Sequence, residues 1–201
     1  MSENYIQMIG QDKIYPIIRC KEASQTIEIA KALVEGGIRV LEINVENPSI
    51  YEAIQEVSKF ANVCAGGIIT SMQADAALEC GAKLFSSPIF QMNMVKISKN
   101  KQVPFIAGAS TANEAYNAWK SRIPVVKIYP ISAMGGVEYI ENLLRPMPFL
   151  NVIPQGNVKL DEVPKYIEAG AIAVGVGRHL TVADDYKEIT KRAKQLLEQL
   201  R

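Results

Sequence analysis

The chain has 201 residues, of which 48% are hydrophobic and 21% are charged, and its formal net charge is +1. This composition is ordinary for a globular protein, and the near-neutral charge gives no support for binding to nucleic acid or to an anionic membrane surface. No apolar run approaches the roughly 20 residues of a membrane span, and residues 1–4 lack the start of a signal peptide.

The cysteine and histidine counts restrict the chemistry. Cys20, Cys64 and Cys80 are widely spaced, odd in number and without a CxxC pair. They predict reduced, mostly buried thiols in a cytoplasmic protein rather than a disulfide framework. His179 is the only histidine, so the chain offers too few closely spaced ligands for the usual zinc site. We therefore expect either no tightly held metal or one that is held only by oxygen ligands.

Strand and helix patterns alternate along the chain after a short helix predicted within residues 1–13. Eight short apolar stretches, several rich in β-branched residues, predict strands at 14–20, 39–45, 62–66, 83–88, 104–110, 125–130, 151–155 and 171–177. Helical patterns follow them at 23–35, 47–60, 71–80, 91–99, from 111 onward, 137–144, 160–168 and 183–200.

Two of these helices begin with specific signals. Asn47 and Pro48 predict a capping residue followed by a proline at the first helical position. Thr111 and Glu114 have the spacing of a capping box, in which each side chain bonds to the backbone N–H of the other residue.

The repeated strand–helix units predict the fold class. Eight units with short connections and no flexible linker indicate an α/β protein with a parallel sheet, in a single domain over residues 1–201. The number of units favours a closed (β/α)8 TIM barrel. The alternative is an open doubly wound sheet, which the lack of a G-x-G-x-x-G motif after the first strand disfavours.

The predicted strand at 125–130 contains a lysine, Lys127, among apolar residues. A lysine is seldom buried without a partner or a function. An amine removed from water tends to lose its proton, and a neutral amine can attack a carbonyl carbon to form a Schiff base. The alternative is a lysine that extends its ammonium group into solvent, and this strand alone does not decide between the two.

Alternation along the strands groups further polar residues with Lys127. In a (β/α)8 barrel, catalytic side chains lie at the carboxyl ends of strands and point inward. The pattern of apolar neighbours predicts that Glu42, Asn44 and Lys127 face the lumen, and that Arg19 at the end of the first strand does too. A structural Glu42–Lys127 ion pair is the alternative, but the convergence of Glu42, Lys127 and Arg19 on one interior favours a functional site.

Five segments carry a resemblance to a known family, namely 30–42, 108–111, 126–130, 135–137 and 173–177. Through them the chain resembles, over nearly its whole length, the 2-keto-3-deoxy-6-phosphogluconate (KDPG) and 4-hydroxy-2-oxoglutarate (KHG) aldolase family. The resemblance implies a class I pyruvate aldolase without metal or cofactor, on a (β/α)8 barrel, and a homotrimer. Its partners would be small molecules, pyruvate and an aldehyde.

The resemblance also implies roles for individual residues. Lys127 looks like the Schiff-base lysine, and Glu42 looks like the general acid and base of carbinolamine formation. The implied reaction is the reversible cleavage of a 2-keto-3-deoxy-6-phospho sugar acid or of KHG. Its products would be pyruvate and either glyceraldehyde 3-phosphate or glyoxylate. The implied substrate-binding positions are Arg19, Asn44, Gly67, Pro88, Gly156, Gly177 and Arg178.

Several of these positions depart from the family pattern. Asn44 and Glu46 stand where a threonine and a carboxylate-binding arginine are usual, so Arg19 is the candidate to bind that carboxylate. Gly67 lacks a hydroxyl, and Asn157 replaces a glycine of the phosphate loop. Arg178 stands where serine is frequent and would add charge there, although a surface arginine is an equal alternative.

The departures leave other functions open. One is a paralogue that acts on a different keto acid, which Glu46, Gly67 and Asn157 favour. Another is a relative that only binds a metabolite, against which the presence of both Lys127 and Glu42 argues. A phosphate-binding isomerase on the same fold rests on fold analogy alone.

Overall fold

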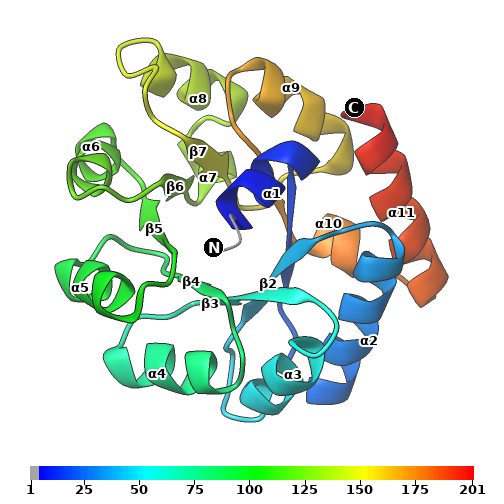
Figure 1. The fold of residues 1–201 in the computed structure, drawn as a ribbon. Helices are drawn as coiled ribbons and strands as arrows, with labels where there is room; N and C mark the ends of the chain where they lie inside the picture. The colour runs from blue at the N-terminus through cyan, green and yellow to red at the C-terminus, as the bar shows by residue number, and fades with distance from the viewer. Residues whose placement is uncertain (1–4) are drawn as a thin grey trace.

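Eight parallel strands form a ring at the centre of the computed structural model, which describes residues 5–201 (Figure 1). Their order in the sheet is β7-β6-β5-β4-β3-β2-β1-β8, and a bridge between Gln155 and Gly175 joins the two ends. The strands are β1 (Ile14–Ile18), β2 (Val40–Asn44), β3 (Asn62–Gly66), β4 (Leu84–Ser86), β5 (Phe105–Ala109), β6 (Val125–Ile128), β7 (Val152–Pro154) and β8 (Val174–Val176). The sequential order and the closure confirm the (β/α)8 barrel and exclude the open doubly wound sheet.

The helices surround the barrel (Figure 1). The longer ones are α2 (Ala23–Glu35), α3 (Ile50–Val57), α4 (Ser71–Glu79), α5 (Met92–Lys101), α6 (Ala112–Lys120), α8 (Val137–Leu144), α9 (Val163–Glu168) and α11 (Tyr186–Gln199). Shorter pieces are α7 (Ile131–Met134), the 3₁₀ turn η1 (Leu160–Glu162) and α10 (Arg178–Thr181). Within residues 5–201, no helix is both long and apolar enough to cross a bilayer.

Side-chain alternation divides the core into two layers. Outward residues such as Leu41 and Ile43 pack against the helices, whereas inward residues such as Val40, Cys64 and Val125 fill the lumen. The helix α1 (Tyr5–Asp12) lies across one end of the barrel, where Ile9 packs into the inner layer (Figure 1). Among residues 5–201, this helix covers the amino-terminal end of the lumen, opposite the carboxyl ends of the strands.

Several predicted boundaries differ from the structure. The leading helix covers residues 5–12, while residues 1–4 of that prediction lie outside the described residues. The helix predicted at 47–60 begins at Ile50, so Asn47 is not its cap. Asn47 instead accepts from the backbone N–H of Ser49 at 2.9 Å, which stabilises a turn before the helix.

Two short helices, α7 and α10, follow strands in places where no helix was predicted. Four-residue helices carry too few apolar positions to show a helical period. The helix predicted at 160–168 is divided into η1 and α9. The capping box of Thr111 and Glu114 is confirmed at the start of α6.

Candidate active site

Lys127 and Glu42 meet inside the lumen, on β6 and β2. Glu42 is fully buried and Lys127 is 3% exposed. Lys127 Nζ lies 3.5 Å from Glu42 Oε1. Both residues stand in strands whose flanking side chains pack outward against helices, which leaves the lysine and the glutamate on the inner face. A cation and a carboxylate thus share one desolvated site.

Two hydroxyl groups that the sequence did not reveal complete this cluster. Ser86 Oγ, at the end of β4, accepts from Lys127 Nζ at 3.1 Å and donates to Glu42 Oε2 at 2.6 Å. Tyr15 OH, on β1, donates to the same oxygen at 2.9 Å. Both residues are fully buried. The sequence signal that could have found Ser86 and Tyr15 is their inward position in the predicted strands.

Asn44 is the fourth partner of Glu42. With its amide turned so that both ends are paired, Asn44 donates to Glu42 Oε1 at 3.0 Å and accepts from Arg19 Nε at 3.1 Å and Nη2 at 2.7 Å. Glu42 therefore has two donors on each oxygen, counting Lys127. This number matches the acceptor capacity of an ionised carboxylate and stabilises its charge in the lumen.

Gly66 provides the space for this arrangement. A Cβ atom there would lie 2.6 Å from Glu42 Cγ and closer still to the Asn44 side chain. Asn44 and Gly66 are partners in the β2–β3 register. The glycine at the end of β3 is therefore required for the Glu42 and Asn44 side chains to lie across the neighbouring strand.

Burial also affects two other groups beside Glu42. It raises the pKa of the Tyr15 phenol, and the nearby Cys64 and Glu42 raise it further. Burial likewise raises the pKa of the Cys64 thiol, with a further contribution from the charge of Glu42. Tyr15 therefore remains a hydrogen-bond donor over the ordinary pH range, and Cys64 remains a neutral thiol.

The raised pKa of the Cys64 thiol predicts alkaline destabilisation. In the unfolded chain the thiol ionises with a pKa of about 8.5, whereas in the folded chain the Cys64 thiol keeps its proton. Above that pH the native state therefore binds more protons than the unfolded state. The contribution of Cys64 should lower the free energy of unfolding by about 1.4 kcal/mol per pH unit above roughly pH 8.5.

Urea unfolding between pH 8 and pH 10 measures this slope. Cys64→Ala should make the decline shallower, whereas Cys80→Ala, at a half-buried cysteine, should change it less. An equal pH slope in the wild type and in Cys64→Ala would contradict the assignment.

A cavity of about 420 Å³ lies at the carboxyl ends of β1, β6, β7 and β8. Four predicted substrate-binding residues line it, namely Arg19, Gly156, Gly177 and Arg178. Lys127 and Glu42 are buried and are not among its lining residues, although 4% of the Lys127 side chain remains exposed. The cavity wall includes Ile17, a residue of the inner layer, and Tyr129, two positions after the lysine.

The other three predicted binding residues lie outside this wall. Asn44 pairs with Glu42 and Arg19, as described above. Gly67 follows β3 with a φ of +75°, a conformation that favours glycine. Pro88 follows β4, and its main chain packs closely against Gly108.

Arg19 lies at the mouth of the lumen, where its guanidinium reaches the buried Asn44. The strand β1 ends at Ile18, so strand alternation no longer sets the direction of the next side chain. The Arg19 side chain is 60% exposed at the mouth, and its Nε lies 3.4 Å from Glu46 Oε1. Arg19 thus connects the mouth to Glu42 through Asn44, and Glu46 offsets part of its charge.

Polar side chains also gather at the β7 and β8 side of the cavity. Asn157 has a φ of +56°, and its Oδ1 accepts from Arg178 Nη2 and lies 3.2 Å from His179 Nε2. Gln155 is buried in the wall, and its Oε1 has no hydrogen-bond partner among the described residues. This side offers one cation, an imidazole and an unpaired acceptor to a ligand.

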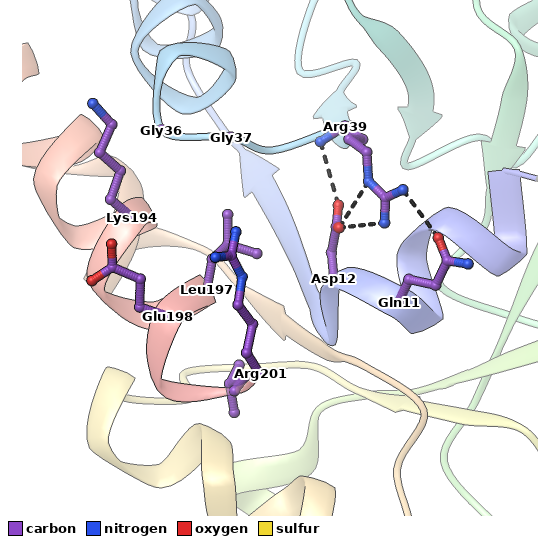
Figure 2. Close-up of a pocket in the computed structure, with 10 residues that line it drawn as sticks. Gln11, Asp12, Gly36, Gly37, Arg39, Lys194, Leu197, Glu198 and Arg201 are labelled. Carbon is purple, nitrogen blue, oxygen red and sulfur yellow. Dashed lines mark hydrogen bonds and ion pairs between the residues drawn. The ribbon is translucent and has the colours of Figure 1, made fainter.

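A second pocket, of about 400 Å³, lies at the opposite end of the barrel (Figure 2). Arg39 precedes β2 and pairs there with Asp12 at 2.5 Å and with Gln11 at 3.0 Å. The charged side chains that line this pocket are exposed or paired with each other, and neither Lys127 nor Glu42 lines it. No group of three or more His, Cys, Asp or Glu side chains within residues 5–201 is placed to hold a metal ion.

Comparisons with known proteins identify the family of the chain. The sequence model of the KDPG and KHG aldolase family matches residues 6–192. The 2-dehydro-3-deoxy-phosphogluconate aldolase of Treponema pallidum is 27% identical over 194 residues, which cover 92% of each chain. The KHG/KDPG aldolase of Escherichia coli is 28% identical over 193 residues, which cover 92% of this chain and 91% of the relative.

Solved structures share the fold. A KDPG aldolase from Zymomonas mobilis superposes with a TM-score of 0.89 at 24% identity, over 96% of each chain. A KDPG aldolase from Legionella pneumophila, with pyruvate captured as a covalent carbinolamine, has a TM-score of 0.86 at 21% identity, over 94% of this chain and 96% of that one. With the family match over most of its length, the chain belongs to the KDPG and KHG aldolase family.

Proposed function

We propose that Lys127 is the Schiff-base lysine of this aldolase and that Glu42 transfers the protons of the reaction. The observation that supports this most strongly is the desolvated Lys127–Glu42 pair near the carboxyl ends of the barrel strands. Burying both groups has a desolvation cost that an ion pair on the surface does not have. A catalytic role explains why the lumen contains them.

The chemistry follows from the positions of these two groups. The Lys127 amine adds to the keto carbon of the substrate and, after loss of water, forms an iminium. The cationic nitrogen withdraws electrons from the neighbouring C–C bond, so that bond breaks and leaves the enamine of pyruvate. Glu42 accepts and returns protons within hydrogen-bonding range of the nitrogen. The carbinolamine in the Legionella pneumophila structure is the adduct that precedes the iminium.

The aldehyde half of the substrate is expected in the cavity. For KDPG the products are pyruvate and glyceraldehyde 3-phosphate, and for KHG they are pyruvate and glyoxylate. Arg178 and His179 line the β7 and β8 side and favour an anionic end there, at the place where (β/α)8 barrels frequently bind phosphate. The unpaired Gln155 oxygen could accept from a substrate hydroxyl.

A different keto acid is the second candidate substrate. The observation that favours it is the Arg19–Glu46 ion pair, because Glu46 competes with a substrate carboxylate for the arginine. Comparing kcat/KM for KDPG, for KHG and for a non-phosphorylated 2-keto-3-deoxy acid decides between them. A preference for the non-phosphorylated acid would favour the second candidate.

Borohydride trapping tests the Schiff base directly. Incubation with pyruvate and borohydride should attach one pyruvyl group to Lys127, which peptide mass mapping locates. The urea-unfolded chain is the control, since it has the same lysines without the lumen. A folded chain that gains no adduct, or gains it on another lysine, would contradict the proposed role.

We also propose that the chain acts in the cytoplasm as a single-domain subunit of a homotrimer. The family resemblance supports the trimer, and the three free cysteines support a reducing compartment. A solution mass of one chain, measured by light scattering, would refute the trimer.

A further inference from the structure

Ser86 connects the two groups assigned to the reaction. Its Oγ is the acceptor for Lys127 Nζ at 3.1 Å and the donor to Glu42 Oε2 at 2.6 Å. Among the described residues, no other hydroxyl has a hydrogen bond to both side chains. Two consecutive hydrogen bonds, Nζ–H···Oγ and Oγ–H···Oε2, therefore link the amine to the carboxylate. Each of them carries one exchangeable proton.

The direct contact between the amine and the carboxylate is weaker. Lys127 Nζ lies 3.5 Å from Glu42 Oε1, at the limit of hydrogen-bonding range, whereas both contacts of Ser86 are within the normal range. Proton transfer becomes slower as donor and acceptor separate, so the path through the hydroxyl is favoured over the direct one.

We propose that Ser86 is a catalytic residue that relays protons from Lys127 Nζ to Glu42 while the Schiff base forms. The inference rests on the proposed function, because it needs Lys127 to be the reacting amine. Tyr15 has a different role. Its phenol donates to the carboxylate and, among the described residues, has no hydrogen bond to Nζ, so it positions Glu42 without lying on the path.

The relay accounts for every proton of the step. One proton passes from the Lys127 ammonium to Ser86 Oγ as the serine proton passes to Glu42. The free amine then forms the N–C bond, and the carbonyl π electrons move to oxygen, which Glu42 protonates. A second proton leaves nitrogen by the same path, Glu42 delivers it to the hydroxyl, and water departs as the nitrogen lone pair forms the C=N bond. Glu42 ends ionised, as it began.

The rate of imine formation tests the relay. Wild type, Ser86→Ala, Ser86→Thr and Tyr15→Phe are mixed with pyruvate and quenched with borohydride at increasing times, and the Lys127 adduct is quantified. Ser86→Ala should slow the trapping rate about 10- to 100-fold, since general acid–base transfer contributes at least that much. Ser86→Thr, which keeps the hydroxyl, should recover most of the rate.

Tyr15→Phe is the matched control. It removes one hydrogen bond to the same Glu42 oxygen but leaves the path from Nζ intact, so its effect on the trapping rate should be several-fold smaller than that of Ser86→Ala. Equal effects of the two changes would assign Ser86 a positioning role only and overturn the relay.

The outcomes separate this inference from the proposed function. Ser86→Ala at the wild-type rate, with the adduct on Lys127, overturns the relay and leaves the Schiff-base lysine intact. A wild type without an adduct on Lys127 overturns both. Circular dichroism spectra establish which variants fold. If Ser86→Ala does not fold, the trapping rate of Ser86→Thr still provides a test.

Discussion

Lys127→Ala is expected to reduce kcat below detection while the barrel still folds. Without the amine no iminium forms, so no group withdraws electrons from the C–C bond. Removing one member of a buried ion pair can cost about 3–5 kcal/mol. The three neutral donors that stay on Glu42, from Tyr15, Ser86 and Asn44, should keep the loss at the lower end of that range.

A pyruvate-detecting coupled assay and thermal unfolding by circular dichroism measure the two effects. Lys59→Ala is the control, since it breaks an exposed ion pair with Glu56 and should change stability by less than about 1 kcal/mol. Turnover within tenfold of the wild type in folded Lys127→Ala would rule out the Schiff-base role.

Glu42→Gln should lower kcat about 10²- to 10⁴-fold, the range that general acid–base groups contribute. The amide cannot accept a proton from nitrogen in the lumen. It also turns an NH₂ group toward donors that faced a carboxylate oxygen, and it leaves Lys127 without a counter-ion. We therefore expect destabilisation of about 3–5 kcal/mol together with the loss of activity.

A double-mutant cycle separates these two losses. Lys127→Met combined with Glu42→Gln removes both charges, so the double variant should be less destabilised than the sum of the single variants. Its activity should stay as low as that of Lys127→Met. Additive stability losses would show that the two side chains do not interact energetically, contrary to their 3.5 Å separation.

The sequence predicted the barrel because its strands and helices alternate with clear periods, and the same periods placed Lys127 and Glu42 in the lumen. It did not reveal Ser86 as a partner of both. Serine is common near strand ends, and its contact with Glu42 joins residues 44 positions apart, which depends on the register between β2, β3 and β4.

Other features were missed for local reasons. Tyr15 reads as an ordinary aromatic residue in a strand, and only its three-dimensional position brings the phenol to Glu42. Arg19 is exposed because β1 ends one residue earlier, a boundary that sequence patterns do not resolve. Gln155 gave no signal, because an unpaired buried oxygen is visible only when its surroundings are known.

The helix α1 across the amino-terminal end of the barrel has a kinetic consequence. Among residues 5–201, this helix covers that end, and the cavity lies at the carboxyl ends of the strands, so both products are expected to leave through the mouth by which the substrate arrived. If pyruvate is held covalently on the buried Lys127, as proposed, an aldehyde in the cavity lies between it and solvent. Release is then ordered, with the aldehyde first and pyruvate last, and in the synthetic direction pyruvate must bind first.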